Sequence, residues 1–347
     1  MKDLLLLQLH AYKEILVTQL NQFGYCGEFI SDQEASELIE TRLLCQTRGM
    51  FFLIDYAKIT NDKKYITLAT KIYQKIQAEY YNNNSQIWTQ YPKNKQNQST
   101  SKDKMLYEYA FIITAYAKLY SVTKDSELLT HIKRVKEIIF TDFYNHDSKF
   151  SKLSNHEIGI NQNALMHLFE ALIEAASIDK IYQNDLQLLG DNLLAEIYNN
   201  ENHLIRENSR LEIYEPGHSF EWASLILEAK QKNMFTTNIN ENLIADQAEK
   251  LGITHQELVV TELSKKEQTD STIRIWPTLE RLRYYAMRPN QEKTISAASH
   301  LVKHFFSKQN LPFEYLDNSL IPQQEKVKST TGYHIINCYK YVLEIVN

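Results

Sequence analysis

Glycine and proline are scarce in this chain: 8 glycines and 6 prolines occur in 347 residues. Their combined share is about a third of the roughly 12% that average usage would give. These two residues mark most turns and interrupt regular elements. A long chain with so few of them is predicted to use few kinds of element with simple connections, and we therefore expect α-helices.

The hydrophobic pattern agrees with this expectation. In residues 50–59 the large apolar side chains recur at helical spacing, and Leu68 and Ile72 continue the pattern. Strict alternation of apolar and polar residues, which is typical of a half-buried strand, is scarce. Strands are therefore predicted to be a minor component.

Internal similarity favours a closed ring of helices. Residues 55–65 resemble residues 115–125, and residues 171–179 form a weaker third copy, so the copies are roughly 60 residues apart. Repeats of open helical solenoids are shorter, about 34 to 47 residues. Repeated helix pairs can stack openly or close into a ring, and about six pairs of this length fit in the chain. The sequence predicts an all-α fold, an (α/α)6 barrel with six inner helices surrounded by six outer ones.

Two polar stretches lack this periodicity. Residues 81–103 are rich in Asn, Gln, Lys and Ser, and residues 238–266 are charged and less periodic. Both are predicted to be surface loops rather than functional low-complexity segments. No domain boundary is visible, so we expect residues 1–347 to form a single catalytic domain.

Charge and hydropathy exclude several classes of function. The chain has 38 basic and 43 acidic side chains, a net charge of −5, which does not suit a protein that binds nucleic-acid phosphates. No apolar run approaches the roughly 20 residues of a membrane-spanning helix. The apolar run at residues 4–7, beside Asp3, is too short for a signal peptide. We expect neither a nucleic-acid nor a membrane partner.

The cysteines indicate a reducing environment. Cys26, Cys45 and Cys338 are odd in number and widely scattered. A disulfide framework needs paired cysteines, and no CxxC motif or Cys/His spacing for zinc is present. The pattern predicts reduced thiols, a cytoplasmic location and no metal site.

A histidine and a carboxylate occupy one predicted helix start. Pro216-Gly217 is a turn signal and a helical run begins near Phe220, so His218 and Glu221 lie three residues apart on one helix face. Such a pair can act as acid and base, with the carboxylate fixing the imidazole tautomer or contacting substrate hydroxyls. The alternative is a structural helix start in which the acid complements the helix dipole. The segment alone favours neither interpretation.

Two more histidines have unusual neighbours. His167 is a lone polar residue in an apolar helical run, and His334 follows Gly332 at the start of the last predicted helix. Taken alone, each segment is more typical of a buried, hydrogen-bonded structural histidine than of a catalytic one.

Other helix starts carry residue types that bind sugars. Trp276 and Glu280 lie four residues apart around Pro277, and Arg48 precedes the apolar residues 49–57. Tryptophan faces stack on sugar rings and carboxylates accept from hydroxyl groups, although each residue alone could be structural. In an α/α barrel the inner-helix ends converge on one mouth, so these side chains could share one pocket.

Several segments together resemble the signatures of a known family. They occur in the family's order, from Arg48 to His334: Met-His-Leu-Phe-Glu-Ala at 166–171, Pro-Gly-His-Ser-Phe-Glu-Trp at 216–222, Trp-Pro-Thr-Leu-Glu at 276–280 and Tyr-His at 333–334, with lesser motifs at 107–111 and 313–317. On these residues the chain resembles the N-acylglucosamine 2-epimerase superfamily. The second and third segments resemble its mannose isomerase branch of aldose–ketose isomerases.

The resemblance implies an (α/α)6 barrel that isomerises a small sugar without metal or cofactor, with His218 and His334 as acid/base residues. A homodimer is compatible with it. Phe313 stands where the family commonly has tryptophan, which affects the expected sugar more than the chemistry. The resemblance also implies a set of substrate-binding or supporting residues: Arg48, His167, Arg210, Glu221, Trp276 and Glu280.

Interconversion of an aldose and a 2-ketose requires ring opening and proton transfer between C2 and C1 through an enediolate. We expect His334 to move the carbon-bound proton. His218, oriented by Glu221, is expected to assist ring opening and move protons at the oxygens. Arg48 and His167 are expected to hold hydroxyl groups and the enediolate oxygen.

Other functions remain open at the level of sequence. A 2-epimerase for N-acylglucosamine, N-acylmannosamine or a β-1,4-disaccharide such as cellobiose begins with the same step but returns the proton to the opposite face of C2, and two histidines could serve both faces. A glycoside hydrolase would need two carboxylates that flank the bond, and no such pair stands out. A non-catalytic helical scaffold is compatible with composition alone.

Overall fold

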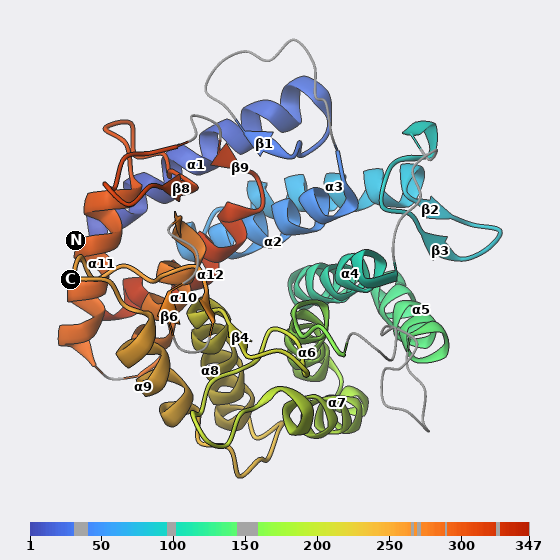
Figure 1. Cartoon of the computed structure of the whole chain (residues 1–347). Helices are drawn as coiled ribbons and strands as arrows, with labels where there is room; N and C mark the ends of the chain where they lie inside the picture. The colour runs from blue at the N-terminus through green and yellow to red at the C-terminus, as the bar shows by residue number, and fades with distance from the viewer. Residues whose placement is uncertain are drawn as a thin grey trace.

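The computed structural model describes residues 1–30, 41–95, 102–143, 159–264, 267–268, 272–288, 290–323 and 327–346. These residues form the predicted (α/α)6 barrel (Figure 1). Its inner ring consists of α2 (Leu43–Thr60), α4 (Lys102–Thr123), α6 (Asn163–Ile178), α8 (Pro216–Gln231), α10 (Ile275–Ala286) and α12 (Thr331–Ile345). The outer helices that pack against them are α3 (Lys64–Glu79), α5 (Ser126–Asp142), α7 (Gln183–Ile197), α9 (Glu241–Gly252), α11 (Gln291–Phe305) and α1 (Lys2–Phe23).

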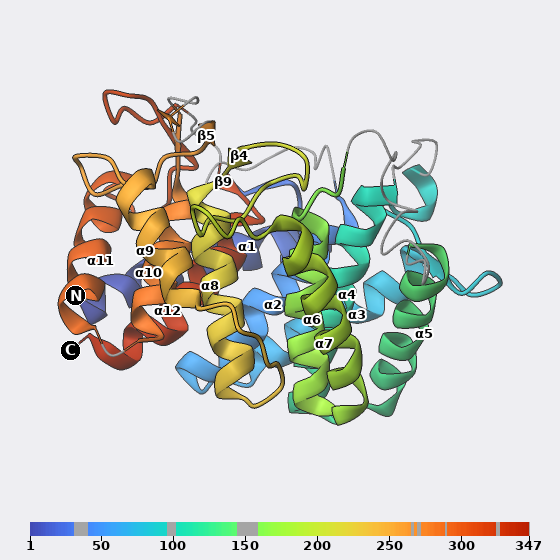
Figure 2. The same ribbon diagram turned by 60° about the horizontal axis from the view of Figure 1, so that its bottom comes forward.

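Inner and outer helices differ in how much of their surface is buried. Every residue of α2 from Leu43 to Ala57 is buried, and so is the whole of α10. The outer helix α3 instead buries one stripe, composed of Tyr65, Ala69, Ile72, Tyr73 and Ile76. An inner helix is covered by its ring neighbours and an outer helix, whereas an outer helix needs only one apolar face. The ring is closed by the first and last helices, since α1 packs on α12 and the two termini lie side by side in Figures 1 and 2.

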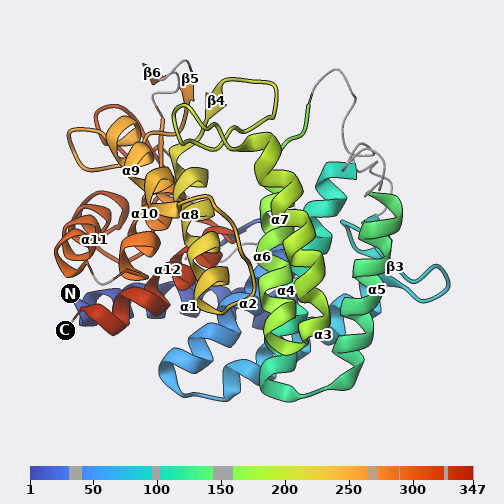
Figure 3. The same cartoon turned by 90° about the horizontal axis from the view of Figure 1, so that it is seen from below.

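Short antiparallel strands connect the loops at one end of the barrel. The pairs are β1 (Phe29–Ile30) with β9 (Val327–Lys328), β4 (Ile213–Tyr214) with β5 (Leu263–Ser264), β5 with β6 (Glu267–Gln268), and β7 (Ile273–Arg274) with β8 (Tyr315–Leu316). Figures 2 and 3 show β4 and β5 together beyond the helix ends. These pairs join the loops that precede α2, α8, α10 and α12, so they fix where these inner helices begin. Strands are a minor component, as predicted.

The prediction of a loop over residues 238–266 is wrong for its first half, which α9 occupies. Asn240 caps this helix by accepting a hydrogen bond from the backbone N–H of Asn242. The apolar face that α9 buries against the barrel consists mostly of small residues, which give a weak helical pattern in the sequence: Ile244, Ala245, Ala248 and Gly252.

The other predicted loop, residues 81–103, is only partly described. Residues 81–95 form a hairpin of β2 (Tyr81–Asn82) and β3 (Ile87–Trp88) followed by a 3-10 turn, and α4 already begins at Lys102. Residues 96–101 lie outside the described part of the chain. The three cysteines are buried and form no disulfide. Within the described ranges, no helix is long and apolar enough to cross a membrane.

Candidate active site

A cavity of about 140 Å³ lies where the inner helices begin. The six inner helices run in the same direction, so the residues of their first turns meet at one end of the barrel. The cavity is lined by Arg48, Tyr107, Asn163, His167, Glu215, His218, Glu221, Arg274, Trp276, Glu314, Thr330, Thr331 and His334. The side chains are mostly polar or charged although eight of the thirteen are buried, which is the character of a site for a polar ligand.

Most of the residues implied by the resemblance meet in this cavity: Arg48, His167, His218, Glu221, Trp276 and His334. The other two do not line it. Glu280 is completely buried beneath the cavity, where it contacts His334 and Arg283. Arg210 is exposed on the loop before β4, whereas Arg274 lines the cavity in addition to Arg48.

His218 is held by the loop that precedes its helix. Its Nδ1 lies 2.8 Å from Oε2 of Glu207 and 3.6 Å from Oε2 of Glu215. Burial disfavours the charged ring, but these two carboxylates outweigh burial and raise the pKa of His218 to about 10. The expectation that Glu221 orients this ring is wrong, because Glu207 makes the hydrogen bond. At neutral pH His218 is therefore an imidazolium.

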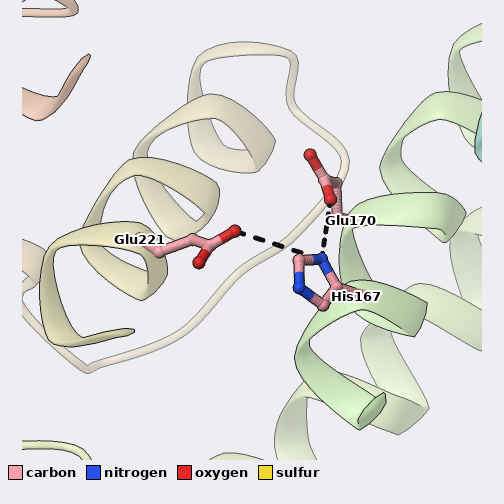
Figure 4. Close-up of side chains that lie close together, drawn as sticks. All are labelled: His167, Glu170 and Glu221. Atoms are coloured by element: carbon pink, nitrogen blue, oxygen red, sulfur yellow. Dashed lines mark hydrogen bonds and ion pairs between the residues drawn. The ribbon is translucent and has the colours of Figure 1, made fainter. Parts of the chain in front are cut away.

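Glu221 points across the cavity from α8 towards His167 on α6 (Figure 4). Its Oε1 lies 4.0 Å from Nδ1 of His167. Both carboxyl oxygens are buried, and neither has a hydrogen-bond partner among the described residues. Burial, with the negative charges of Glu280 and Glu170, raises the pKa of Glu221 well above its usual range. Glu221 is therefore a neutral carboxyl group that can donate a hydrogen bond to a ligand oxygen.

His167 is fixed from below by Glu170, one turn further along α6. Nδ1 of the histidine lies 3.1 Å from Oε2 of the glutamate (Figure 4). The other carboxylate oxygen accepts hydrogen bonds from the hydroxyl of Tyr333 and, at 3.4 Å, from the amide of Asn337. Burial lowers the pKa of His167. A neutral His167 therefore presents its remaining ring nitrogen to the cavity.

His334 stands on α12 with Nδ1 2.7 Å from Oε1 of Glu280. Burial, and after it the charges of Arg48 and His167, hold the pKa of His334 well below its usual range. The ring is therefore neutral. The Trp276 ring lies between the two histidines, with its centroid 4.7 Å from that of His218 and 5.6 Å from that of His334.

Arg48 provides a buried cation. Its Nη2 donates to the hydroxyl of Tyr107 at 2.6 Å, and its guanidinium carbon lies 4.3 Å from the Phe111 ring centroid and 4.7 Å from that of Tyr333. Nε has no partner, and within the described ranges no carboxylate forms an ion pair with this side chain. A buried guanidinium without a counter-ion is suited to an anionic oxygen.

Sequence reasoning missed the carboxylates that hold His218. The loop from residue 198 to 215 folds back on itself through bridges between Tyr198 and Ile205 and between Arg206 and Tyr214. This fold brings Glu207 beside His218, eleven residues away, and no spacing rule indicates such a contact. Glu314 lies in the lesser motif at 313–317 and Arg274 lies two residues before the motif at 276–280, but the sequence did not assign either to the site. They form an ion pair of 3.3 Å at its edge.

Three groups of side chains have ligand atoms close enough to surround a metal ion, all within 4.8 Å of one another: His167 with Glu170 and Glu221, His218 with Glu207 and Glu215, and His334 with Glu221 and Glu280. In each group the imidazole Nδ1 is already hydrogen-bonded to a carboxylate. The contacts are those of histidine–carboxylate pairs, which orient rings and fix tautomers.

The barrel and its histidine-lined mouth place the chain in the structural class of (α/α)6-barrel proteins that includes sugar epimerases and isomerases. A D-mannose isomerase superposes with a TM-score of 0.79 at 18% identity, over 100% of this chain and 98% of that one. The cellobiose 2-epimerase of Bacillus thermoamylovorans B4167 superposes with a TM-score of 0.76 at 16% identity, over 99% of both chains. A sugar epimerase from a ruminal bacterium gives 0.75 at 14%, over 98% of this chain and 99% of that one.

Sequence comparison identifies the family. The profile of the N-acylglucosamine 2-epimerase (GlcNAc 2-epimerase) family matches residues 79–338, and the chain belongs to this family. No curated protein matches the chain by sequence. The predicted superfamily and the predicted fold are both confirmed.

Proposed function

We propose that this protein is a sugar isomerase that interconverts an aldose and a 2-ketose, of the D-mannose/D-fructose type, through an enediolate. The observation that carries the proposal is that two histidines in different protonation states line one small cavity. His218 is an imidazolium and His334 is a neutral imidazole. Proton transfer through an enediolate needs both an acid and a base.

His334 is the proposed base. Its Nδ1–H donates to Glu280, so the lone pair on Nε2 is free to take a proton. In the open-chain aldose it removes the proton from C2, and it later returns this proton to C1. The two steps give the 2-ketose without any other acceptor for the carbon-bound proton.

His218 is the proposed acid at the oxygen atoms. It gives a proton to O1 as C2 is deprotonated, and it recovers one from the O2 hydroxyl as the ketose forms. Before this, His218 assists ring opening by donating a proton to the ring oxygen and taking up the proton released from the O1 hydroxyl, so it is an imidazolium again when C2 is deprotonated. Glu221, which is neutral and has no partner among the described residues, donates to a further substrate oxygen.

The negative charge that develops on the substrate oxygen as C2 is deprotonated is stabilised by Arg48 together with the helix ends, while Nε2 of His167, whose Nδ1 is bound to Glu170, accepts from a substrate hydroxyl group. The guanidinium of Arg48 has an unpartnered Nε, and the first two turns of the six inner helices supply residues that line the cavity. Helix N-termini carry a positive partial charge. Donors and dipoles arranged before the reaction stabilise a developing oxyanion more than water does.

A second candidate function, sugar 2-epimerisation, is favoured by an adjoining cavity. A space of about 270 Å³ shares Tyr107 and Asn163 with the reaction cavity and continues between the starts of α4 and α6. It would accommodate the acyl group of an N-acylated hexosamine or the second ring of a disaccharide. Epimerisation would require a second histidine to return the proton to the opposite face of C2.

NMR of the purified protein with D-mannose in D2O, in the presence of EDTA, tests the proposal. We expect fructose to form with deuterium at C1, and deuterium to enter C2 of the mannose that remains. Glucose as the first product would replace isomerase by 2-epimerase. If neither sugar forms, mannose is not a substrate, and N-acylated hexosamines and cellobiose are tested next. The same experiment tests metal independence, because a metal-dependent enzyme would be inactive with EDTA and recover when divalent cations are added.

A further inference from the structure

Arg283 connects the candidate active site to the interior of the barrel. It lies on α10, and only 1% of its surface is exposed. Nη1 lies 3.3 Å from Oε2 of Glu280, and Nη2 lies 3.3 Å from Oε2 of Glu228. The side chain therefore stands below the cavity and contacts the carboxylate that holds His334.

Arg283 belongs to a ring of charges, which we call the inner charge ring, with one residue from each inner helix: Asp55, Lys118, Glu174, Glu228, Arg283 and Lys340. Lys118 lies 2.9 Å from Asp55 and 3.3 Å from Glu174. Three acids and three bases balance one another. The guanidinium is thus held in place by Glu228 on one side while it faces Glu280 on the other.

The protonation of Glu280 decides which tautomer His334 adopts. An ionised Glu280 can only accept, so the ring proton lies on Nδ1 and Nε2 is free in the cavity. A protonated Glu280 would donate to Nδ1 and move the ring proton to Nε2, which would then no longer be a base. Glu280 is completely buried, which favours the protonated form, and Arg283 is the strongest opposing influence.

We propose that Arg283 is a positioning residue that keeps Glu280 as the hydrogen-bond acceptor for Nδ1 of His334, so that Nε2 of this histidine stays available as the base. This inference rests on the proposed function, since it names the residue that prepares the proposed base. Arg283 itself does not line the cavity, so its effect on the reaction is indirect.

Other charged or titratable groups also face this pair. These groups interact electrostatically with Glu280, His334 or Arg283. They lie on α2, α6, α8 and α12 and at the residue before α10: Arg48, His167, Glu170, Glu221, Glu228, Arg274, Cys338 and Tyr341. Of these, Glu170 and Glu221 oppose ionisation of Glu280. Arg283 is the cation in direct contact with its carboxylate.

Arg281 offers a matched control on the same helix. It is also buried, with 3% of its surface exposed, and it also binds two carboxylates, those of Glu249 and Glu257. These partners lie on α9 and in the loop that follows, away from the cavity. Replacing either arginine removes a buried cation from α10, but only Arg283 contacts Glu280.

The experiment compares Arg283→Met, Arg283→Lys and Arg281→Met by ¹⁵N-imidazole NMR and by kinetics. In the wild type we expect His334 as the tautomer with hydrogen on Nδ1. Arg283→Met should move the hydrogen to Nε2 and lower kcat about 100-fold or more, because a wrong tautomer removes the base. KM should change little. The kcat of Arg283→Lys should be at least about tenfold higher than that of Arg283→Met, since lysine restores the cation. Arg281→Met should keep the wild-type tautomer and kcat within about threefold.

An unchanged tautomer in folded Arg283→Met would overturn the inference, as would an equal loss of kcat in Arg281→Met. If Arg283→Met does not fold, Arg283→Gln decides, because this variant also lacks the cation: a wild-type tautomer in folded Arg283→Gln excludes the role. The NMR readout needs no substrate, so it remains valid if the protein proves inactive on every sugar tested. Inactivity of the wild type would count against the proposed function alone.

Discussion

At the scale of single residues, two buried histidines differ in charge because their surroundings differ. His218 has Glu207 and Glu215 within 3.6 Å of the same nitrogen, and these carboxylates outweigh burial. His334 has one carboxylate partner, while Arg48 and His167 add to the cost of charging it. Desolvation favours the neutral form of both rings, so the number of nearby anions decides the outcome.

The first prediction concerns the proposed base. His334→Ala should lower kcat by about 10²–10⁴, the usual contribution of a positioned acid or base, while circular dichroism and the melting temperature remain close to wild type. His255→Ala is the control, because this histidine is exposed in the loop after α9 and does not line the cavity. Near wild-type turnover of the His334 variant would refute its role.

The second prediction concerns the charge of His218. Since its pKa is raised to about 10, activity that needs the imidazolium should persist to alkaline pH and fall as pH rises through that value. Glu207→Gln removes the hydrogen-bonded carboxylate and should move this fall to lower pH. The stability from the ion pair should be complete below about pH 6.5, the ordinary pKa, and be lost as pH approaches 10. A pH–rate profile that coincides for both proteins contradicts the assignment.

At the scale of elements, the starts of α8 and α10 approach closely because α8 has a glycine at its second position. A Cβ at Gly217 would lie 2.7 Å from the Trp276 ring and 2.7 Å from Cβ of Pro277. The glycine thus allows two inner helices to bring His218 and Trp276 together. Side chains in such a packed contact can shift only at an energetic cost.

The third prediction follows from this contact. Gly217→Ala should destabilise the fold by about 1–3 kcal/mol, the usual cost of overpacking, and should lower kcat/KM because the Trp276 ring is displaced between the two histidines. Thermal unfolding and sugar turnover measure the two effects. A protein with unchanged melting temperature and turnover would show that the helix starts are free to separate.

At the scale of the whole molecule, the inner charge ring joins all six inner helices. Burial raises the pKa of Asp55, but Lys118 and Lys340 outweigh burial and lower it to about 2. The carboxylate therefore contributes stability above its ordinary pKa of about 3.9, and this stability is lost as pH falls towards 2.

The fourth prediction tests the charge ring. Lys118→Met leaves Asp55 buried without its nearest cation and should cost about 3–5 kcal/mol, as is usual when one partner of a buried pair is removed. Asp55→Asn combined with Lys118→Met should cost less than the sum of the single changes. Urea unfolding at neutral pH measures all three variants. Additive costs would mean that the pair does not interact across the barrel.

The sequence by itself determined the fold class, the family and about half of the cavity residues. Scarce glycine and proline, helical periodicity and the roughly 60-residue repeat are local signals, and they suffice because each helix pair repeats one pattern. Motifs at the starts of α2, α6, α8, α10 and α12 indicated six of the residues that line the cavity, because helix starts leave clear marks in sequence.

Only the tertiary structure decided which carboxylate holds each histidine and which residues line the cavity. Glu207 rather than Glu221 holds His218, and Glu280 lies beneath His334 instead of lining the cavity. Arg274 lines the cavity, whereas Arg210 does not. The helix α9 was missed because its buried stripe is small and flanked by charged residues. These contacts join residues from different helices and loops, so they depend on how the ring closes. Burial, which sets the charge of each histidine, is likewise a property of the assembled barrel and of no single segment.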